Sequence, residues 1–195
     1  MLLSILIRTV HTRVSENLPW LINELIRQAD EFNKERTTIQ ILYLGDNKTM
    51  TAGEKLNHLV RISDGRYIAV VDDDDRPRKD YIASLMEAIK SNADVIVFDV
   101  MRYEDGEKDK ITKFDYLNTK DLNLATHYIR LPNHIMCFRR DIAIRVPYMN
   151  ISWGEDAIFA KQVRQYIRTQ HRINKVLYEY RFSKANTETQ KHLVK

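Results

Sequence analysis

Four consecutive aspartates are the residues of this sequence best suited to chemistry. Asp72, Asp73, Asp74 and Asp75 follow the apolar run 67–71, which predicts a short buried strand. Carboxylates this close repel one another where the dielectric constant is low, and a bound divalent cation relieves that repulsion. Mg²⁺ binds carboxylate oxygens and leaves other positions to water and substrate phosphates. The run predicts a metal-assisted site for a phosphorylated or nucleotide substrate; the alternative is a solvated acidic turn before a helix.

The composition is that of an ordinary globular domain. The chain has 195 residues, of which 44% are hydrophobic and 30% charged, and its net charge of +4 is compatible with an anionic substrate. The sequence contains no run of 18 apolar residues, so no transmembrane helix is predicted, and the first ten residues lack the features of a signal peptide. The single cysteine, Cys137, allows no internal disulfide, so a cytoplasmic location is expected.

Strand and helix patterns alternate over the first half of the chain. Predicted strands cover residues 2–7, 39–44, 67–71 and 94–100. Predicted helices cover residues 18–29, 51–62 and 80–90, with Ser15 and Thr51 as caps of the first two. This alternation predicts an α/β fold with a mostly parallel sheet and helices on both faces.

The second half is less regular. Residues 104–106 predict a hairpin turn, and residues 108–123 are polar with little periodicity. A short strand at 135–138, a short helix at 141–146, a helix opening at Gly154 and a last strand at 172–181 complete the prediction. We expect a single domain over residues 1–182 and a polar, mobile tail over residues 183–195.

Five short segments occur in the order typical of one enzyme family. They are Arg8-Thr9 at the first strand end, Asp46 at the second, residues 51–57, residues 64–68 before the aspartates, and residues 154–156. Together they resemble the family-2 glycosyltransferases over residues 2–181. The resemblance implies the GT-A fold, the Rossmann-like fold of nucleotide-diphospho-sugar transferases, with a mostly parallel sheet flanked by helices.

The resemblance also assigns roles to the aspartates. The family pattern D-x-D makes Asp74 the main metal ligand and places Asp72 near the ribose or a metal-bound water, while Asp73 lies on the donor side. Asp73 and Asp75 have the same spacing, so the register stays open by one residue. Mn²⁺ or Mg²⁺ at this position would stabilise the charge on the departing diphosphate as a Lewis acid.

Five further residues are implied as donor-binding: Thr9, Arg13, Asp46, Lys55 and Asn57. Asp46 matches the acid that accepts a hydrogen bond from the base, with an Asx turn as its alternative. Lys55 and Asn57 begin a predicted helix, where they could reach a diphosphate or a sugar. Their alternative is an ordinary solvated helix face.

The acids that open the late helix are implied to be catalytic. Inverting transfer needs a base that deprotonates the acceptor hydroxyl, and the resemblance gives this role to Asp156, with Glu155 as an acceptor contact or support. Favourable charge at a helix N-terminus would explain both acids without chemistry. His134 and Trp153 are candidate sugar or acceptor contacts; the alternatives are a core hydrogen bond for His134 and core packing for Trp153.

The chain departs from the family pattern at several positions. Arg8 stands where a proline is usual, Val10-His11 replaces an aromatic–asparagine pair, and Leu56 stands where a basic residue often precedes Asn57. Tyr180-Arg181 resembles the closing tyrosine-rich strand but lacks a following histidine, so no further metal ligand is assigned there.

These observations predict a soluble, metal-dependent, inverting glycosyltransferase. The donor would be a nucleotide sugar, with a UDP-sugar favoured, and the acceptor a hydroxyl of a glycan or a lipid-linked saccharide. A hydroxylated base in DNA is an alternative acceptor, motivated by the arginines at 139, 140, 145, 164, 168 and 172. A non-catalytic nucleotide-sugar-binding module is another alternative. Nucleotidyl transfer is disfavoured because no glycine-rich basic loop follows the first strand.

Overall fold

The structure is a computed structural model that describes residues 1–14, 17–32 and 38–183. Ser15, the predicted cap of the first helix, lies outside the described residues. So does residue 184 onward, which is nearly all of the predicted tail.

A single sheet contains all ten strands of the described residues, in the order β2-β1-β3-β9-β5-β6-β8-β7, with β10 paired to β5 and β4. The strands are β1 (Leu3–Val10), β2 (Ile39–Asp46), β3 (Tyr67–Val70), β4 (Arg76–Pro77), β5 (Val95–Glu104), β6 (Glu107–Phe114), β7 (Leu122–Asn123), β8 (His127–Arg130), β9 (Cys137–Arg139) and β10 (Gln170–Phe182). The predicted α/β class is confirmed.

The main strands of the sheet run in one direction. Strand β1 pairs in parallel with both β2 and β3, and β5 pairs in parallel with β10. Strand β9 lies antiparallel between β3 and β5. The predicted mostly parallel sheet is confirmed. Because β1, β2 and β3 are parallel, their carboxyl ends meet at one edge, where Val10 lies opposite Asp46.

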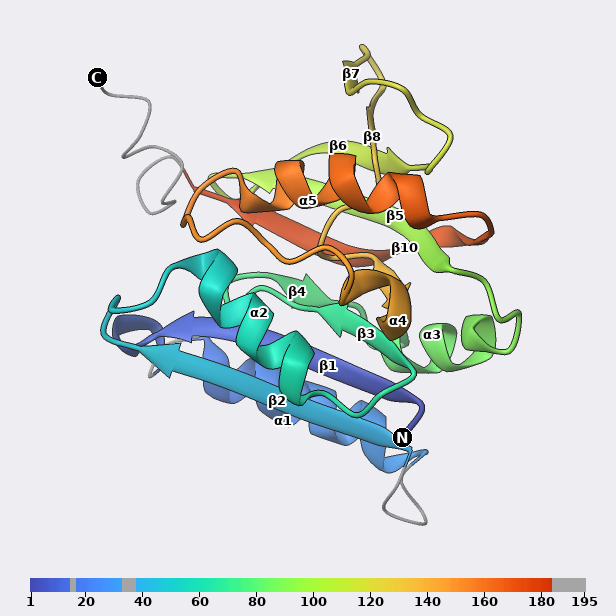
Figure 1. Ribbon diagram of the computed structural model, residues 1–195. Coiled ribbons are helices and arrows are strands. Elements are labelled where there is room, and N and C mark those ends of the chain that lie inside the picture. Colours follow the sequence, from blue (N-terminus) through green and yellow to red (C-terminus); the bar gives the residue numbers. More distant parts are fainter. Residues whose placement is uncertain (15–16, 33–37, 184–195) are drawn as a thin grey trace.

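Helices cover both faces of this sheet. They are α1 (Leu18–Asp30), α2 (Ala52–Ile62), α3 (Tyr81–Ile89), α4 (Arg140–Ala143) and α5 (Glu155–Val163), with two 3₁₀ turns, η1 (His11–Arg13) and η2 (Arg164–Tyr166). Helices α2 and α5 lie on the near side in Figure 1 and α1 on the far side, where it contacts α3. Thr51 caps α2 as predicted, since its Oγ1 accepts a hydrogen bond from Glu54 N at 3.1 Å.

Aromatic packing anchors α5 to the sheet. The ring of Phe159 stacks on Tyr148, with centroids 4.3 Å apart, and meets Phe138 of β9 edge-on at 5.4 Å. All three rings are buried in the hydrophobic core. The packing holds the middle of α5 against the sheet, while the first turn of the helix needs other contacts.

The segment after β5 differs from the prediction. Asp105 and Gly106 form the predicted hairpin turn, with φ of 48° and 87°. Beyond it, β6, β7 and β8 are regular strands where the sequence showed little periodicity. Strand β6 is defined by its pairing with β5 and β8, which are partners that a local pattern does not reveal.

Candidate active site

A cavity of about 780 Å³ opens at the carboxyl ends of β1 and β3 and at the first turn of α5. Its walls include four parts of the chain that are far apart in sequence: the end of β1, the aspartate run, the segment around His134, and residues 152–157. Most of the residues predicted for the site line this cavity. They are Thr9, Arg13, Lys55, Asp72, Asp73, Asp74, His134, Trp153, Glu155 and Asp156.

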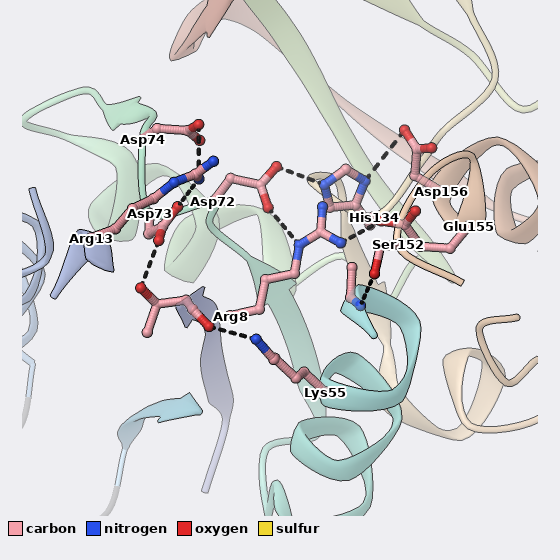
Figure 2. Close-up of polar contacts among 12 residues, drawn as sticks. Arg8, Arg13, Lys55, Asp72, Asp73, Asp74, His134, Ser152, Glu155 and Asp156 are labelled. Atoms are coloured by element: carbon pink, nitrogen blue, oxygen red, sulfur yellow. Dashed lines mark hydrogen bonds and ion pairs between the residues drawn. The ribbon is translucent and has the colours of Figure 1, made fainter. Parts of the chain in front are cut away.

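The carboxylate of Asp72 is held between two basic groups. Arg8 Nε donates to Asp72 Oδ1 at 3.1 Å, and His134 Nε2 lies 2.9 Å from Asp72 Oδ2 (Figure 2). Burial by itself would raise the pKa of Asp72, but Arg8 and His134 outweigh it and hold that pKa well below its usual range. Asp72 therefore stays ionised, with both of its oxygens engaged.

Asp73 is held by the segment that follows β1. Thr9 Oγ1 donates to Asp73 Oδ2 at 2.6 Å, and Arg13 Nη1 donates to Asp73 Oδ1 at 2.8 Å. The same Arg13 nitrogen lies 3.1 Å from Asp74 Oδ2. Thr9 and Arg13, both predicted to bind the donor, thus position the aspartate run in this structure.

Asp74 and Asp75 have different environments. The side chain of Asp74 is 35% exposed and lines the cavity. Burial, the charge of Asp72 and the charge of Asp73 raise its pKa to about 6, against the opposing effect of Arg13. Asp75 is fully buried, and its Oδ1 accepts a hydrogen bond from Arg181 N at 2.8 Å. Of the two D-x-D registers, the one formed by Asp72 and Asp74 faces the cavity.

The aspartates fit a cation that shares its coordination with a ligand. In the described part of the chain, no three His, Cys, Asp or Glu side chains converge on a common metal position. Asp74 offers a partly exposed carboxylate with a raised pKa, which a positive charge would lower. Mg²⁺ and related ions are commonly bound by one or two carboxylates together with phosphates and water. Asp74 fits this arrangement, while Asp72 is already engaged by Arg8 and His134.

Lys55 and Asp46 form a buried pair that supports the end of β1. Lys55 Nζ donates to Thr9 O at 2.7 Å and pairs with the carboxylate of Asp46. Asp46 Oδ2 also accepts hydrogen bonds from Thr49 Oγ1 at 2.8 Å and Met50 N at 2.6 Å. The carboxylate of Asp46 thus closes the turn after β2 through bonds three and four residues ahead, whereas the Asx turn considered as its alternative bonds two residues ahead. Lys55 is buried rather than on a solvated face.

Asn57 lies away from the cavity lining. Its Nδ2 donates to Tyr148 O at 2.8 Å, and its Oδ1 accepts from Tyr148 N at 2.8 Å. Two residues before Lys55, a Cβ on Gly53 would lie 1.9 Å from Met149 O. The segment predicted to contact the donor therefore holds the loop before α5 in place. We accordingly leave Asn57 out of the donor contacts proposed below.

Both opening acids of helix α5 line the cavity, but they differ in exposure. Glu155 is buried and pairs with Arg8 Nη1. The side chain of Asp156 is 36% exposed, and its Oδ2 lies 3.8 Å from His134 Nδ1 (Figure 2). Gly154 precedes both acids with φ of +80°, a conformation that favours glycine. Asp156 is therefore the carboxylate of this pair available to a ligand, and Trp153 lies exposed at the rim.

Two features of the site were missed by the sequence prediction. Arg8 joins Asp72 to Glu155, and the only signal was its departure from the usual proline. The far wall of the cavity contains Arg102 of β5 and Tyr128 and Arg130 of β8. Strand β8 was not predicted, so its contribution to the wall could not be anticipated.

The comparisons with known proteins agree with the fold. Residues 22–147 match the model described as Glycosyl transferase family 2, and the chain belongs to that family. A comparison with curated protein sequences finds no match.

The solved structures similar to this chain include S. aureus TarS, residues 1–349. Its complex with UDP superposes with a TM-score of 0.65 at 14% identity, covering 94% of this chain and 61% of TarS 1–349. Its complex with UDP-GlcNAc gives a TM-score of 0.67 at 14% identity, covering 98% and 61%. These similarities confirm the GT-A fold. The chain spans about 61% of the length of TarS 1–349.

Proposed function

We propose that this chain transfers a sugar from a nucleotide-sugar donor to a hydroxyl group of an acceptor. The observation that carries the proposal is the convergence of Asp72, Asp74 and Asp156 on one cavity in a chain of glycosyl transferase family 2. UDP and UDP-GlcNAc are bound in the similar structures of TarS, which supports a UDP-sugar as donor.

The donor end of the cavity is the aspartate end. Asp74 would hold Mn²⁺ or Mg²⁺, which when bound supplies a Lewis acid for the charge of the departing diphosphate. Arg13 and Lys48 line the cavity beside it and are suited to bind phosphate oxygens. Asp72, held by Arg8 and His134, is an ionised hydrogen-bond acceptor next to this position.

The acceptor end is the first turn of α5. Asp156 would accept the proton of the attacking hydroxyl, since it is the exposed acid of the pair and lies in the cavity. A base placed opposite the donor end favours attack from the face away from the leaving diphosphate, and hence inversion. Trp153 at the rim supplies an aromatic surface on which a sugar ring can stack.

A glycan or a lipid-linked saccharide is the acceptor that we favour over DNA. The six arginines that motivated DNA as an acceptor share one property. Each donates a hydrogen bond to an oxygen atom of the protein itself. They are Arg139, Arg140, Arg145, Arg164, Arg168 and Arg172. Among the described residues there is no helix of the length and apolarity needed to cross a membrane.

A panel of nucleotide sugars, measured by thermal shift and by release of UDP, tests the proposal. A ligand that binds only the native protein stabilises it by about 2.7 kcal/mol at 100 times its Kd, which corresponds to a melting temperature several degrees higher. We expect a UDP-sugar with Mn²⁺ to produce this shift, and EDTA to reduce it. Asp74→Ala should remove the metal-dependent part. An equal shift in Asp74→Ala, with unchanged sugar transfer, would contradict the assignment.

A further inference from the structure

Arg8 connects the two ends of the cavity. Its Nε donates to Asp72 Oδ1 at 3.1 Å on the donor side, and its Nη1 pairs with Glu155 on the acceptor side. Figure 2 shows the guanidinium group lying between these two acids. Glu155 directly precedes Asp156, so a single side chain from β1 links the aspartate run to the proposed base.

The segment before α5 is held by α2, where Ala52 N donates to Ser152 Oγ at 3.3 Å and Gly53 N donates to Ile151 O at 3.1 Å, but these contacts end before the two acids of the first turn. The N-cap of α5, Gly154, has φ of +80° and makes no side-chain capping hydrogen bond. The aromatic packing of α5 is at Phe159, one turn further along the helix. The direction in which Asp156 points therefore depends on what holds Glu155.

Glu155 depends on Arg8 for its charge balance. The side chain of Glu155 is 4% exposed, and Arg8 is the one basic group paired with it among the described residues. The nearby cations are engaged elsewhere, His134 by Asp72 and Arg13 by Asp73 and Asp74. Removing one partner of a buried pair leaves an uncompensated buried charge, which is strongly destabilising locally. Without Arg8, the buried carboxylate of Glu155 would lose its paired cation, which favours a turn of this side chain toward water.

We propose that Arg8 is a positioning residue that sets the place of Asp156 through Glu155. Its catalytic consequence rests on the function proposed above, whereas its structural consequence does not.

Hydrogen–deuterium exchange of the free protein tests the structural part. We expect Arg8→Met to increase exchange severalfold in peptides covering residues 150–158, while peptides from α3 stay unchanged. Arg8→Lys, whose ammonium can pair with either acid, should give an intermediate result. Arg27→Met is the matched control, because Arg27 is exposed on α1 and pairs with Glu24 of the same helix. Unchanged exchange at residues 150–158 in folded Arg8→Met protein would overturn the proposal.

Steady-state kinetics test whether Arg8 acts through Glu155. We expect Arg8→Met and Glu155→Gln each to lower kcat by roughly 10- to 100-fold through misplacement of the base. Glu155→Gln should change the KM for donor by less than about threefold, whereas Arg8→Met should raise it more, because Arg8 also holds Asp72 on the donor side. The double variant should be little worse than Arg8→Met alone, since Arg8→Met already removes the contact that Glu155→Gln disrupts. If the fold reductions in kcat of the two single variants multiplied in the double variant, the proposal would be overturned. Altered exchange in a protein without transferase activity would instead contradict only the proposed function.

Discussion

Asp74 carries a charge that the folded protein disfavours. Its pKa of about 6 lies above the 3.8 of an ordinary aspartate, so the folded chain holds this proton more tightly than the unfolded chain does. Ionisation of Asp74 therefore destabilises the folded state as the pH rises through about 6, and the effect is absent below the unfolded pKa. A bound cation would offset this unfavourable charge, so Asp74 is suited to bind one.

Asp74→Asn should stabilise the metal-free protein at pH 7.5. A shift of two pKa units is ~3 kcal/mol at most, and the partial exposure of Asp74 reduces this to ~1 kcal/mol, or a melting temperature higher by about 2–4 °C. The difference should narrow as the pH is lowered toward 5, where Asp74 takes up its proton. Glu87→Gln, on the exposed face of α3, serves as the control and should show no such trend. A melting temperature lower at pH 7.5 than that of the unmodified protein would contradict the prediction.

Asp156→Asn should separate catalysis from donor binding. An amide cannot take the proton of the acceptor hydroxyl, so we expect kcat to fall by roughly 10²- to 10⁴-fold. The affinity for UDP with Mn²⁺, measured by calorimetry, should stay within about twofold, because the charged groups that act on Asp74 are Asp72, Asp73 and Arg13 rather than Asp156. Full turnover in this variant would favour a non-catalytic role for the acid and reopen the binding-module alternative.

The acids of the site could be identified from the sequence, but their partners could not. Asp72, Asp74 and Asp156 belong to short segments with recognisable spacing. Arg8 meets acids that are 64 and 147 residues away in sequence, and no local pattern reports such contacts. Asn57 is the opposite case. Its place in a recognisable segment predicted a contact with the donor, whereas in the structure its side chain hydrogen-bonds to the backbone of Tyr148.

At the scale of elements, helix α2 supports two parts of the cavity wall, the end of β1 and the loop before α5. Lys55 supports the end of β1 through Thr9 O, and Asn57 supports the loop before α5 through Tyr148. Gly53 allows that loop to approach, since any Cβ would overlap Met149 O. Gly53 and Asn57, four residues apart, share the face of α2 that meets this loop, whereas Lys55, two residues from each, reaches the end of β1 from another face.

Asn57→Ala should destabilise the protein and lower its turnover. The substitution leaves the N–H and C=O groups of Tyr148 without their partner, at a cost of about 1–3 kcal/mol, or a melting temperature lower by about 2–10 °C. His58→Ala, at the next position of the same helix, is the matched control, because the His58 side chain has no hydrogen bond or ion pair with any residue that the structure describes. Loss of donor affinity without loss of stability would instead indicate a direct ligand contact for Asn57.

The elements of the first half were predicted well because each carries its own apolar pattern. Strands β1, β2 and β3 and helices α1, α2 and α3 begin within one residue of their predicted starts. Strands β6 and β8 were missed because their charged, weakly alternating residues gain strand structure from pairing with β5 and with each other. The direction of β9 also depends on its neighbours β3 and β5 rather than on its own residues.

At the scale of the whole molecule, the net charge of +4 is small for a protein that binds the phosphates of duplex DNA. Of the six arginines considered for DNA, Arg139 and Arg172 are paired with carboxylates, which offset their charge. The other four donate to backbone oxygens, which orients their side chains but leaves their charge. We expect no binding of duplex DNA at micromolar concentration in about 150 mM salt, measured by fluorescence anisotropy. A Kd below about 1 μM that weakens steeply with added salt would contradict this expectation and favour the DNA acceptor.

The last strand of the chain completes the loop that carries the aspartates. Asp72 N donates to Tyr178 Oη at 3.0 Å, and Arg181 N donates to Asp75 Oδ1 at 2.8 Å, both from β10. During translation, a nascent chain halted before residue 170 would already contain every acid of the site but neither of these contacts. Assembly of the acidic loop must therefore await the emergence of about a hundred later residues from the ribosome, and any ligand that depends on its shape can bind only after that.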